Sequence, residues 1–180
     1  MANEFLPAPL PNSYWVEPGR LLAGEYPGSD DHENTIPRVE ALLNTGIDTF
    51  IDLTRSNELV PYEPILYTLA REHGIAVRYQ RMPIQDFGLP STKNMTAILD
   101  TIDDALHASR KVYIHCAGGV GRTGTTVGCY LVRHGSTGRQ ALAQIAEWWQ
   151  ALPKHIHYSR SPETDEQINF ILNWKEGSSP

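Results

Sequence analysis

The sequence predicts a single α/β domain in which a mostly parallel central sheet is flanked by helices on both faces. Short apolar runs rich in β-branched residues alternate along the chain with longer segments whose apolar residues recur at helical spacing. This alternation favours a parallel sheet with right-handed crossovers. The length of 180 residues suits one domain with a substantial core.

The predicted strands are short, and turn residues lie between them. Residues 1–13 contain several Pro residues and are expected to form an extended lead-in, so the domain is expected to span residues 14–176. Pro18 and Gly19 separate the first two strands, and the later strands are apolar runs between helices. Strands are expected at residues 14–16, 21–23, 47–53, 76–82 and 111–114.

The predicted helices are indicated by apolar periodicity and by their end signals. Gly46 and Gly74 are placed to end the first two helices. In the third helix, Ile98, Leu99 and Ile102 fall on one face. Helices are expected at residues 36–44, 64–73, 92–108, 125–134, 140–152 and 162–174.

Composition and charge narrow the class of protein. The net charge of −6 argues against nucleic acid and anionic lipid as partners. No apolar run approaches the ~20 residues of a membrane span, and the first residues do not form a secretory signal. Cys116 and Cys129 form neither a disulfide framework nor a zinc set, and Cys129 is expected in the core. We therefore expect a cytoplasmic protein, and a monomer is the default expectation.

Residues 115–124, with the sequence HCAGGVGRTG, are the most informative segment of the chain. They follow a predicted strand and precede a predicted helix. A strand, a glycine turn and a helix N-terminus together form an anion site from backbone N–H groups and the helix dipole. Cys116 begins this loop and Arg122 ends it. A thiol in such a field ionises easily, so the segment predicts transfer of a phosphoryl group to sulfur.

The glycine pattern has rival interpretations. Residues 119–124 fit the G-x-G-x-x-G dinucleotide motif, but no strand with a terminal acidic residue follows about 20 residues later. A nucleoside-triphosphate loop needs Lys before Thr123, where this chain has Arg122. A third interpretation is a turn that merely connects a strand to a helix. Such a turn does not require a Cys and an Arg at its ends, and its three glycines would cost backbone entropy without a purpose.

This segment resembles the His-Cys-x5-Arg-Thr-Gly signature of the cysteine-dependent protein tyrosine and dual-specificity phosphatases. The resemblance extends over roughly residues 14–174, and the chain length is similar to the compact, bacterial dual-specificity members. It implies a dual-specificity phosphatase fold, a phosphatase domain over residues 14–176 and a phosphorylated protein as substrate. None of the candidate site residues requires a metal or a cofactor.

The chemistry assigns a role to each residue of the signature. Cys116 is the candidate nucleophile that forms a cysteinyl-phosphate, and Arg122 is the candidate clamp for two phosphate oxygens. Thr123 is expected to donate to the sulfur of Cys116 and help it leave, and His115 is expected to orient the loop. The loop residues expected to bind phosphate are Ala117, Gly118, Gly119, Val120 and Gly121.

Asp86 is the candidate general acid for the leaving group. It lies between Pro83 and Pro90 in a predicted loop that could close over a substrate. The resemblance places the acid about 30 residues before the cysteine, which is the position of Asp86. An ordinary turn Asp is the alternative, and Asp48 and Asp52 are weaker candidates.

A last feature precedes the final helix. Tyrosine-specific relatives use a Gln here to position the hydrolytic water. This sequence has Glu163 at that position and Gln167 one helical turn later, so both residues remain candidates. A mildly basic stretch comes just before and is expected to be a solvated loop, with a position bordering the site as the alternative; it contains Lys154, His155, His157 and Arg160.

The loop between Cys116 and Arg122 contains no Lys, Arg or His, which favours a singly phosphorylated group such as phosphotyrosine. The predicted function is a protein phosphatase acting on phosphotyrosine, with phosphoserine and phosphothreonine also considered. Two alternatives stay open: an inositol-polyphosphate phosphatase, and an adaptor that binds phosphoproteins without turnover.

Overall fold

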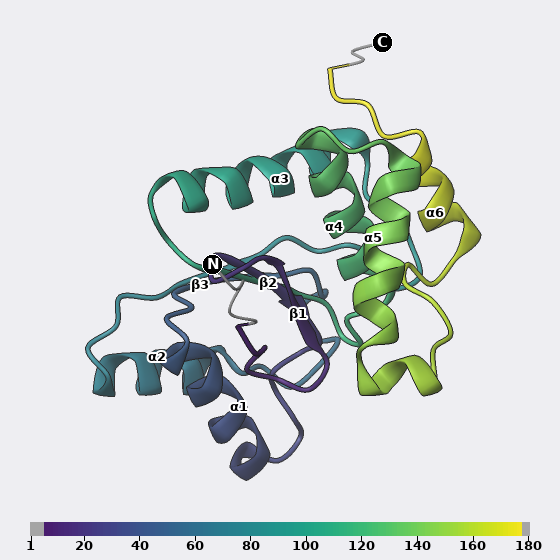
Figure 1. The fold of residues 1–180 in the computed structure, drawn as a ribbon. Helices are drawn as coiled ribbons and strands as arrows, with labels where there is room; N and C mark the ends of the chain where they lie inside the picture. Colours follow the sequence, from purple (N-terminus) through teal and green to yellow (C-terminus); the bar gives the residue numbers. More distant parts are fainter. Residues whose placement is uncertain (1–5, 178–180) are drawn as a thin grey trace.

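A five-stranded sheet runs through the middle of the molecule in this computed structural model, which describes residues 6–177 (Figure 1). The strand order is β1-β2-β5-β3-β4. Only the edge pair β1 and β2 is antiparallel, so the predicted mostly parallel sheet is confirmed. The strands are β1 (Ser13–Glu17), β2 (Leu21–Gly24), β3 (Thr49–Asp52), β4 (Arg78–Arg81) and β5 (Val112–His115).

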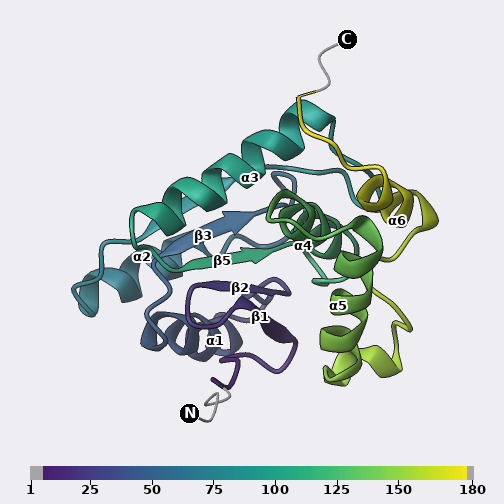
Figure 2. The same ribbon diagram turned by 45° about the horizontal axis from the view of Figure 1, so that its top comes forward.

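Helices cover both faces of the sheet, as predicted. Figures 1 and 2 show α1 and α2 on one side and α3, α4, α5 and α6 on the other. Among residues 6–177, no helix is both long and apolar enough to cross a membrane. The helices are α1 (His32–Asn44), α2 (Glu63–Glu72), α3 (Thr92–His107), α4 (Gly121–Arg133), α5 (Gly138–Gln150), the 3-10 helix η1 (Pro153–Ile156) and α6 (Asp165–Leu172).

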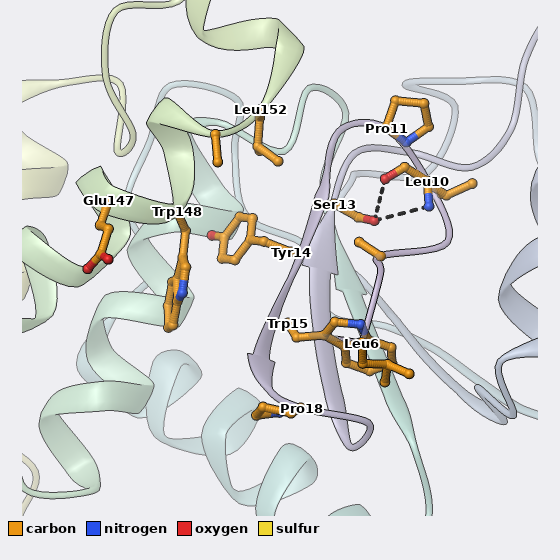
Figure 3. Close-up of a pocket in the computed structure, with 12 residues that line it drawn as sticks. Leu6, Leu10, Pro11, Ser13, Tyr14, Trp15, Pro18, Glu147, Trp148 and Leu152 are labelled. Carbon is orange, nitrogen blue, oxygen red and sulfur yellow. Dashed lines mark hydrogen bonds between the residues drawn. The ribbon is translucent and has the colours of Figure 1, made fainter. Parts of the chain in front are cut away.

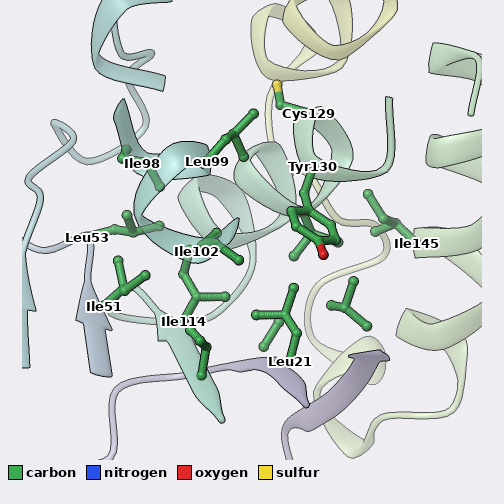
Figure 4. Packing of buried hydrophobic residues seen from close by; sticks show 14 of the residues in the cluster. Leu21, Ile51, Leu53, Ile98, Leu99, Ile102, Ile114, Cys129, Tyr130 and Ile145 are labelled. Carbon is green, nitrogen blue, oxygen red and sulfur yellow. The ribbon is translucent and has the colours of Figure 1, made fainter. Parts of the chain in front are cut away.

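Alternation along the central strands divides the hydrophobic core into two layers. Phe50 of β3 and Tyr113 of β5 pack with the side chains of α1 and α2. Their neighbours Ile51 and Ile114 point to the opposite face and pack against Leu99 and other residues of α3, α4 and α5 (Figure 4). Successive side chains of a strand alternate between faces, so a strand buried on both sides is apolar throughout.

Three helices begin three or four residues away from their predicted starts. α1 begins at His32, not at residue 36, because the carboxylate of Asp31 caps it. α4 begins at Gly121, not at residue 125, so it includes the last residues of the signature. α6 begins at Asp165, not at residue 162, because Thr164 and Gln167 form a capping box there.

The ends of three strands meet at one edge of the sheet. Gly24 of β2 and Asp52 of β3 both pair with His115, the last residue of β5. The loops that leave these strands therefore start side by side. In open α/β sheets, ligands bind at the carboxyl ends of the parallel strands.

A helix glycine provides a test of the packing between α4 and α6. A Cβ at Gly128 would lie 2.7 Å from Cγ1 of Ile171, well inside contact distance. We expect Gly128→Ala to lower the free energy of unfolding by about 1–3 kcal/mol, although Ala is the better helix former. Urea denaturation of both proteins checks this.

The control is the same substitution in an Ile171→Ala background. The clash partner is then absent, and Gly128→Ala should be neutral or stabilising. An equal loss of stability in both backgrounds would show that the packing explanation is wrong.

Candidate active site

The glycine loop (residues 116–121) joins the end of β5 to the start of α4 and curls around the sulfur of Cys116. The backbone N–H of Gly119 donates to Sγ at 3.2 Å, and the thiol is almost completely buried. Gly119 has φ of +73°, and a Cβ there would lie 2.7 Å from the backbone carbon of Gly24. Only glycine allows this close approach of the loop to β2.

Arg122 lies in the first turn of α4 with its guanidinium buried and held on several sides. Nη1 and Nη2 donate to the two carboxylate oxygens of Glu58 at 2.9 and 2.6 Å. Nη1 also donates to the carbonyl of Ile84 at 3.2 Å. Burial alone would lower the pKa of Arg122, but its hydrogen bonds to Glu58 and the nearby carboxylates of Glu58 and Asp86 raise the pKa of the guanidinium overall. Nε is buried with no hydrogen-bond partner among the described residues.

The Asp loop (residues 83–90) follows β4 and brings Asp86 to this guanidinium. Oδ1 of Asp86 lies 3.0 Å from Nη2 of Arg122, and its side chain is 57% exposed. Ile84 fixes the start of the loop, because its N–H donates to the carbonyl of Leu53 at 3.0 Å. The structure thus brings together Cys116, Arg122 and Asp86, three of the four residues that the sequence selected for catalysis.

These groups line one pocket of about 180 Å³. It combines a thiol, a guanidinium and a carboxylate, from Cys116, Arg122 and Asp86. The predicted loop residues Ala117, Gly118, Val120 and Gly121 also line it, whereas Gly119 faces the sulfur through its N–H. The remaining lining residues are Phe87, Tyr158 and Glu163.

Thr123 is placed differently from the prediction. Its buried hydroxyl donates to the carbonyl of Gly24 at 3.4 Å, and no hydrogen bond from it to Sγ of Cys116 is found. The close approach of the glycine loop to β2 explains this, because it brings the Gly24 carbonyl to the start of α4.

His115 lies completely buried behind the loop in a polar network. Its Nε2 is 2.7 Å from the hydroxyl of Tyr62, and its Nδ1 is 3.4 Å from the carbonyl of Cys116. Burial raises the pKa of Tyr62 well above its ordinary value, so its hydroxyl stays protonated. We assign the Tyr62 hydroxyl as the donor and Nε2 of His115 as the acceptor, so that Nδ1 carries the ring proton and directs it toward the Cys116 carbonyl.

Asp52 completes this network. Its Oδ1 lies 3.9 Å from Nδ1 of His115 and accepts from Thr54, while Oδ2 accepts from the hydroxyl of Tyr79 at 2.6 Å. Burial alone would raise the pKa of Asp52, but His115 and these hydrogen bonds lower it overall. Asp52 therefore supports His115 and is not in the pocket, which agrees with its lower ranking as a candidate acid.

Sequence reasoning missed one residue that holds the site, Glu58, and gave the place of Lys154 beside the site only as the less favoured alternative. Glu58, the bidentate partner of Arg122, lies in an irregular segment after β3, and its only sequence signal is its place beyond the end of that strand. Lys154 was expected in a solvated loop, but its Nζ donates to the carbonyl of Gly118 at 2.9 Å and also pairs with Glu25.

Two other features are separate from this site. A pocket of about 490 Å³ runs along β1, where Tyr14 stacks on Trp148 with ring centroids 5.3 Å apart (Figure 3). It contains none of the predicted site residues. Within residues 6–177, no group of three or more His, Cys, Asp or Glu side chains could hold a metal ion. Cys129 is buried in the core, as expected.

A cysteine and an arginine at the two ends of a glycine loop, with an aspartate from a neighbouring loop, define a phosphatase domain of the dual-specificity type. The chain belongs to the PTP-SAK family, described as "Swiss Army Knife protein, DSP-PTPase phosphatase domain", whose model matches residues 10–170.

Relatives of known identity agree with this assignment. Cyclin-dependent kinase inhibitor 3 of Sus scrofa is 34% identical over 151 residues, which cover 82% of this chain but only 66% of that protein. Among solved structures, Tk-PTP in its active form has a TM-score of 0.65 and 25% identity, and 90% of this chain and 94% of that chain are covered. Kinase-associated phosphatase, with its catalytic-site cysteine replaced by serine, has the same fold, with a TM-score of 0.67 at 24% identity over 84% of this chain and 83% of that chain.

The buried imidazole predicts how stability depends on pH. Burial lowers the pKa of His115 below its ordinary value of 6.5, although Asp52 opposes this. At a pH between the lowered pKa of the folded protein and the ordinary value of 6.5, the imidazole binds a proton in the unfolded chain but not in the folded one. Its contribution to the free energy of unfolding is therefore fully present above about pH 6.5 and is lost as the pH falls through the lowered pKa. We expect the free energy of unfolding in urea to decrease from pH 7 to pH 5, and to decrease less in His115→Gln.

The control is His107→Gln, which changes an exposed histidine of α3. This variant should keep the wild-type dependence on pH. If His115→Gln also kept it, the buried imidazole would not be the source of the dependence.

Proposed function

We propose that this chain is a protein phosphatase that hydrolyses phosphotyrosine through a cysteinyl-phosphate, with phosphoserine and phosphothreonine as further substrates to be tested. The observation that carries the proposal is the convergence of the Cys116 thiol, the Arg122 guanidinium and the Asp86 carboxyl on one pocket. Family membership supports protein phosphatase activity in general.

The first half-reaction follows from these groups. The sulfur of Cys116 attacks phosphorus, and the Sγ–P bond forms as the bond from phosphorus to the leaving oxygen breaks. That oxygen takes a proton from Asp86, which must carry one when the substrate binds. The N–H groups of the glycine loop and Arg122 hold the other phosphate oxygens.

The buried, unpartnered Nε–H of Arg122 supports the binding of an anion. A buried donor without an acceptor is unfavourable, and a phosphate oxygen in the pocket would satisfy it. Glu58 already fixes both Nη atoms. The guanidinium is therefore held in place before the substrate arrives, which reduces the entropy lost on binding.

Two supporting roles belong to the same proposal. His115 holds the peptide of Cys116 through its Nδ1–H, as the tautomer assignment implies. Thr123 would donate to the sulfur as it leaves, which requires its hydroxyl to turn from the carbonyl of Gly24 once Sγ carries phosphate.

The walls of the pocket support an aromatic substrate. Phe87 and Tyr158 line it and are 62% and 44% exposed, so two aromatic faces are available to a phosphotyrosine ring. An inositol polyphosphate would need cations for its additional phosphates. The nearby ammonium of Lys154 is already paired with Glu25.

The proposal also includes the bounds of the phosphatase domain and the cellular compartment in which it acts. We propose that residues 14–176 form the phosphatase domain and that it acts as a cytoplasmic monomer on phosphorylated proteins. Two free cysteines, Cys116 and Cys129, support a reducing compartment.

The proposed roles predict two variants of different severity. Cys116→Ser should abolish hydrolysis of p-nitrophenyl phosphate, because the hydroxyl is not ionised. Asp86→Asn should lower kcat about 10²–10⁴-fold for phosphotyrosine, whose leaving group needs the proton. Steady-state kinetics on both substrates measure these effects.

Asp104→Asn, an exposed carboxylate of α3, is the matched control and should leave kcat unchanged. Hydrolysis that survives in Cys116→Ser would contradict the proposed nucleophile. A folded wild-type protein that binds phosphopeptides in reducing buffer without turnover would instead be an adaptor.

A substrate panel tests the preference for phosphotyrosine. We expect higher kcat/KM for phosphotyrosine peptides than for phosphoserine peptides, phosphothreonine peptides or inositol phosphates, because of the two aromatic walls. Tyr158→Ala should raise KM for phosphotyrosine more than for phosphoserine. Faster hydrolysis of inositol phosphates would favour that alternative substrate class.

A further inference from the structure

Two successive carbonyl groups of the glycine loop accept hydrogen bonds from distant parts of the chain. The carbonyl of Ala117 accepts from the backbone N–H of Tyr26, just after β2, at 3.0 Å. The carbonyl of Gly118 accepts from the ammonium of Lys154, in η1, at 2.9 Å. The second of these donors carries a charge, and a hydrogen bond from a charged donor is roughly twice as strong as a neutral one.

The carbonyl of Gly118 and the N–H of Gly119 belong to the same peptide group. In a planar trans peptide these two groups point in opposite directions. The N–H of Gly119 is the one that donates to Sγ of Cys116 at 3.2 Å. A donor bound to the carbonyl on one side of this peptide therefore determines which way the N–H on the other side points.

This peptide group lies between two glycines, so the chain itself does little to fix its orientation. Glycine has no Cβ to restrict rotation of the peptides beside it. A Cβ added at Gly118 would make only an ordinary contact, at 3.4 Å from Cγ2 of Val120, so packing leaves room there. A reversed peptide would turn a carbonyl oxygen toward the sulfur and toward bound phosphate, and a hydrogen bond to that carbonyl opposes the reversal.

The ammonium of Lys154 is itself held in place. It pairs with the carboxylate of Glu25, and the two side chains are only 18% and 16% exposed. Glu25 also pairs with Arg38 at 2.6 Å. The backbone N–H of Lys154 donates to the side-chain oxygen of Asn12 at 3.1 Å. A long, flexible side chain is thus fixed before any ligand arrives, which reduces the entropy lost on binding.

We propose that Lys154 is a positioning residue, whose ammonium holds the peptide between Gly118 and Gly119 so that its N–H faces the pocket. That N–H then donates to Sγ of Cys116 and, when phosphate is bound, to one of its oxygens. The inference rests on the proposed function. Lys154 is not among the residues that line the pocket, so it acts through the peptide. A cationic donor also polarises this peptide and strengthens its N–H as a donor.

The variant Lys154→Met tests this, because it removes the ammonium and keeps an unbranched apolar stem. We expect the Kd of inorganic phosphate, measured as protection of Cys116 from iodoacetamide, to rise about tenfold. The value of kcat/KM for p-nitrophenyl phosphate should fall by a similar factor. Without phosphate, the midpoint of the pH profile of alkylation should move upward by at least about half a pH unit, because the thiolate loses a donor.

Lys111→Met is the matched control. The ammonium of Lys111 also donates to a backbone carbonyl, that of Thr45 at 3.1 Å, but at the start of β5, away from the glycine loop. This variant should keep the wild-type phosphate affinity, kcat/KM and alkylation profile. Urea denaturation gives the folded fraction of each variant. A merely structural role of Lys154 would lower that fraction and kcat without changing the Kd of phosphate for the folded protein.

Wild-type phosphate affinity and a wild-type alkylation profile in folded Lys154→Met would overturn the inference, and so would equal changes in Lys111→Met. Glu25→Gln is a second variant, which weakens the anchor of the ammonium and leaves the loop intact. It should lower the affinity for phosphate by a smaller factor. If Lys154→Met does not fold, an unchanged affinity in Glu25→Gln would overturn the inference.

These outcomes are distinct from failure of the proposed function, because phosphate binding and alkylation need no turnover. A wild-type protein that binds phosphate but hydrolyses no substrate would overturn the proposed function, and the binding measurements would still decide the role of Lys154. An active wild type with an unaffected Lys154→Met variant would uphold the proposed function and overturn the inference.

Discussion

The guanidinium of Arg122 joins three parts of the chain around one buried charge. Glu58 comes from the segment after β3, Ile84 and Asp86 come from the Asp loop, and Arg122 itself opens α4. A charge buried to this degree is tolerated only when it is paired, and removing one partner leaves the others uncompensated. The two loops are therefore fixed relative to the glycine loop, and the distance between the proposed acid and the proposed nucleophile follows from this constraint.

The register of the sheet makes that convergence possible. Gly24, Asp52 and His115 end three adjacent strands at the same level, so the segments after them leave from one edge. Gly119 then packs on the backbone of Gly24, and His115 holds the peptide of Cys116 from behind. The glycine loop is thus fixed by backbone contacts on one side and by buried polar groups on the other.

The sequence predicted what depends on local chain geometry. Cys116 and Arg122 occupy the ends of one strand–loop–helix segment, so their proximity needs no information from elsewhere. Residues that only the folded chain brings together were harder to predict from the sequence. Glu58 lies 64 residues from Arg122 and belongs to no motif, and the hydroxyl of Thr123 turns to a carbonyl of another strand. The predicted starts of α4 and α6 were wrong for a related reason. The geometry of the glycine loop determines where α4 begins, and a capping box determines where α6 begins.

Carboxylates outnumber guanidinium groups around a pocket proposed to bind phosphate, and the geometry resolves this conflict. The charge of Glu58 is balanced by its bidentate pairing with Arg122, and Asp86 would carry a proton in its proposed role as general acid. The attraction for phosphate then comes mainly from backbone N–H groups, which carry no countercharge and act at short range. Among the described residues that line this pocket, Arg122 is the one cation, so a second phosphate would meet the carboxylate of Glu163. Under the proposed function, these electrostatics would favour a ligand with one phosphate over a polyphosphorylated one.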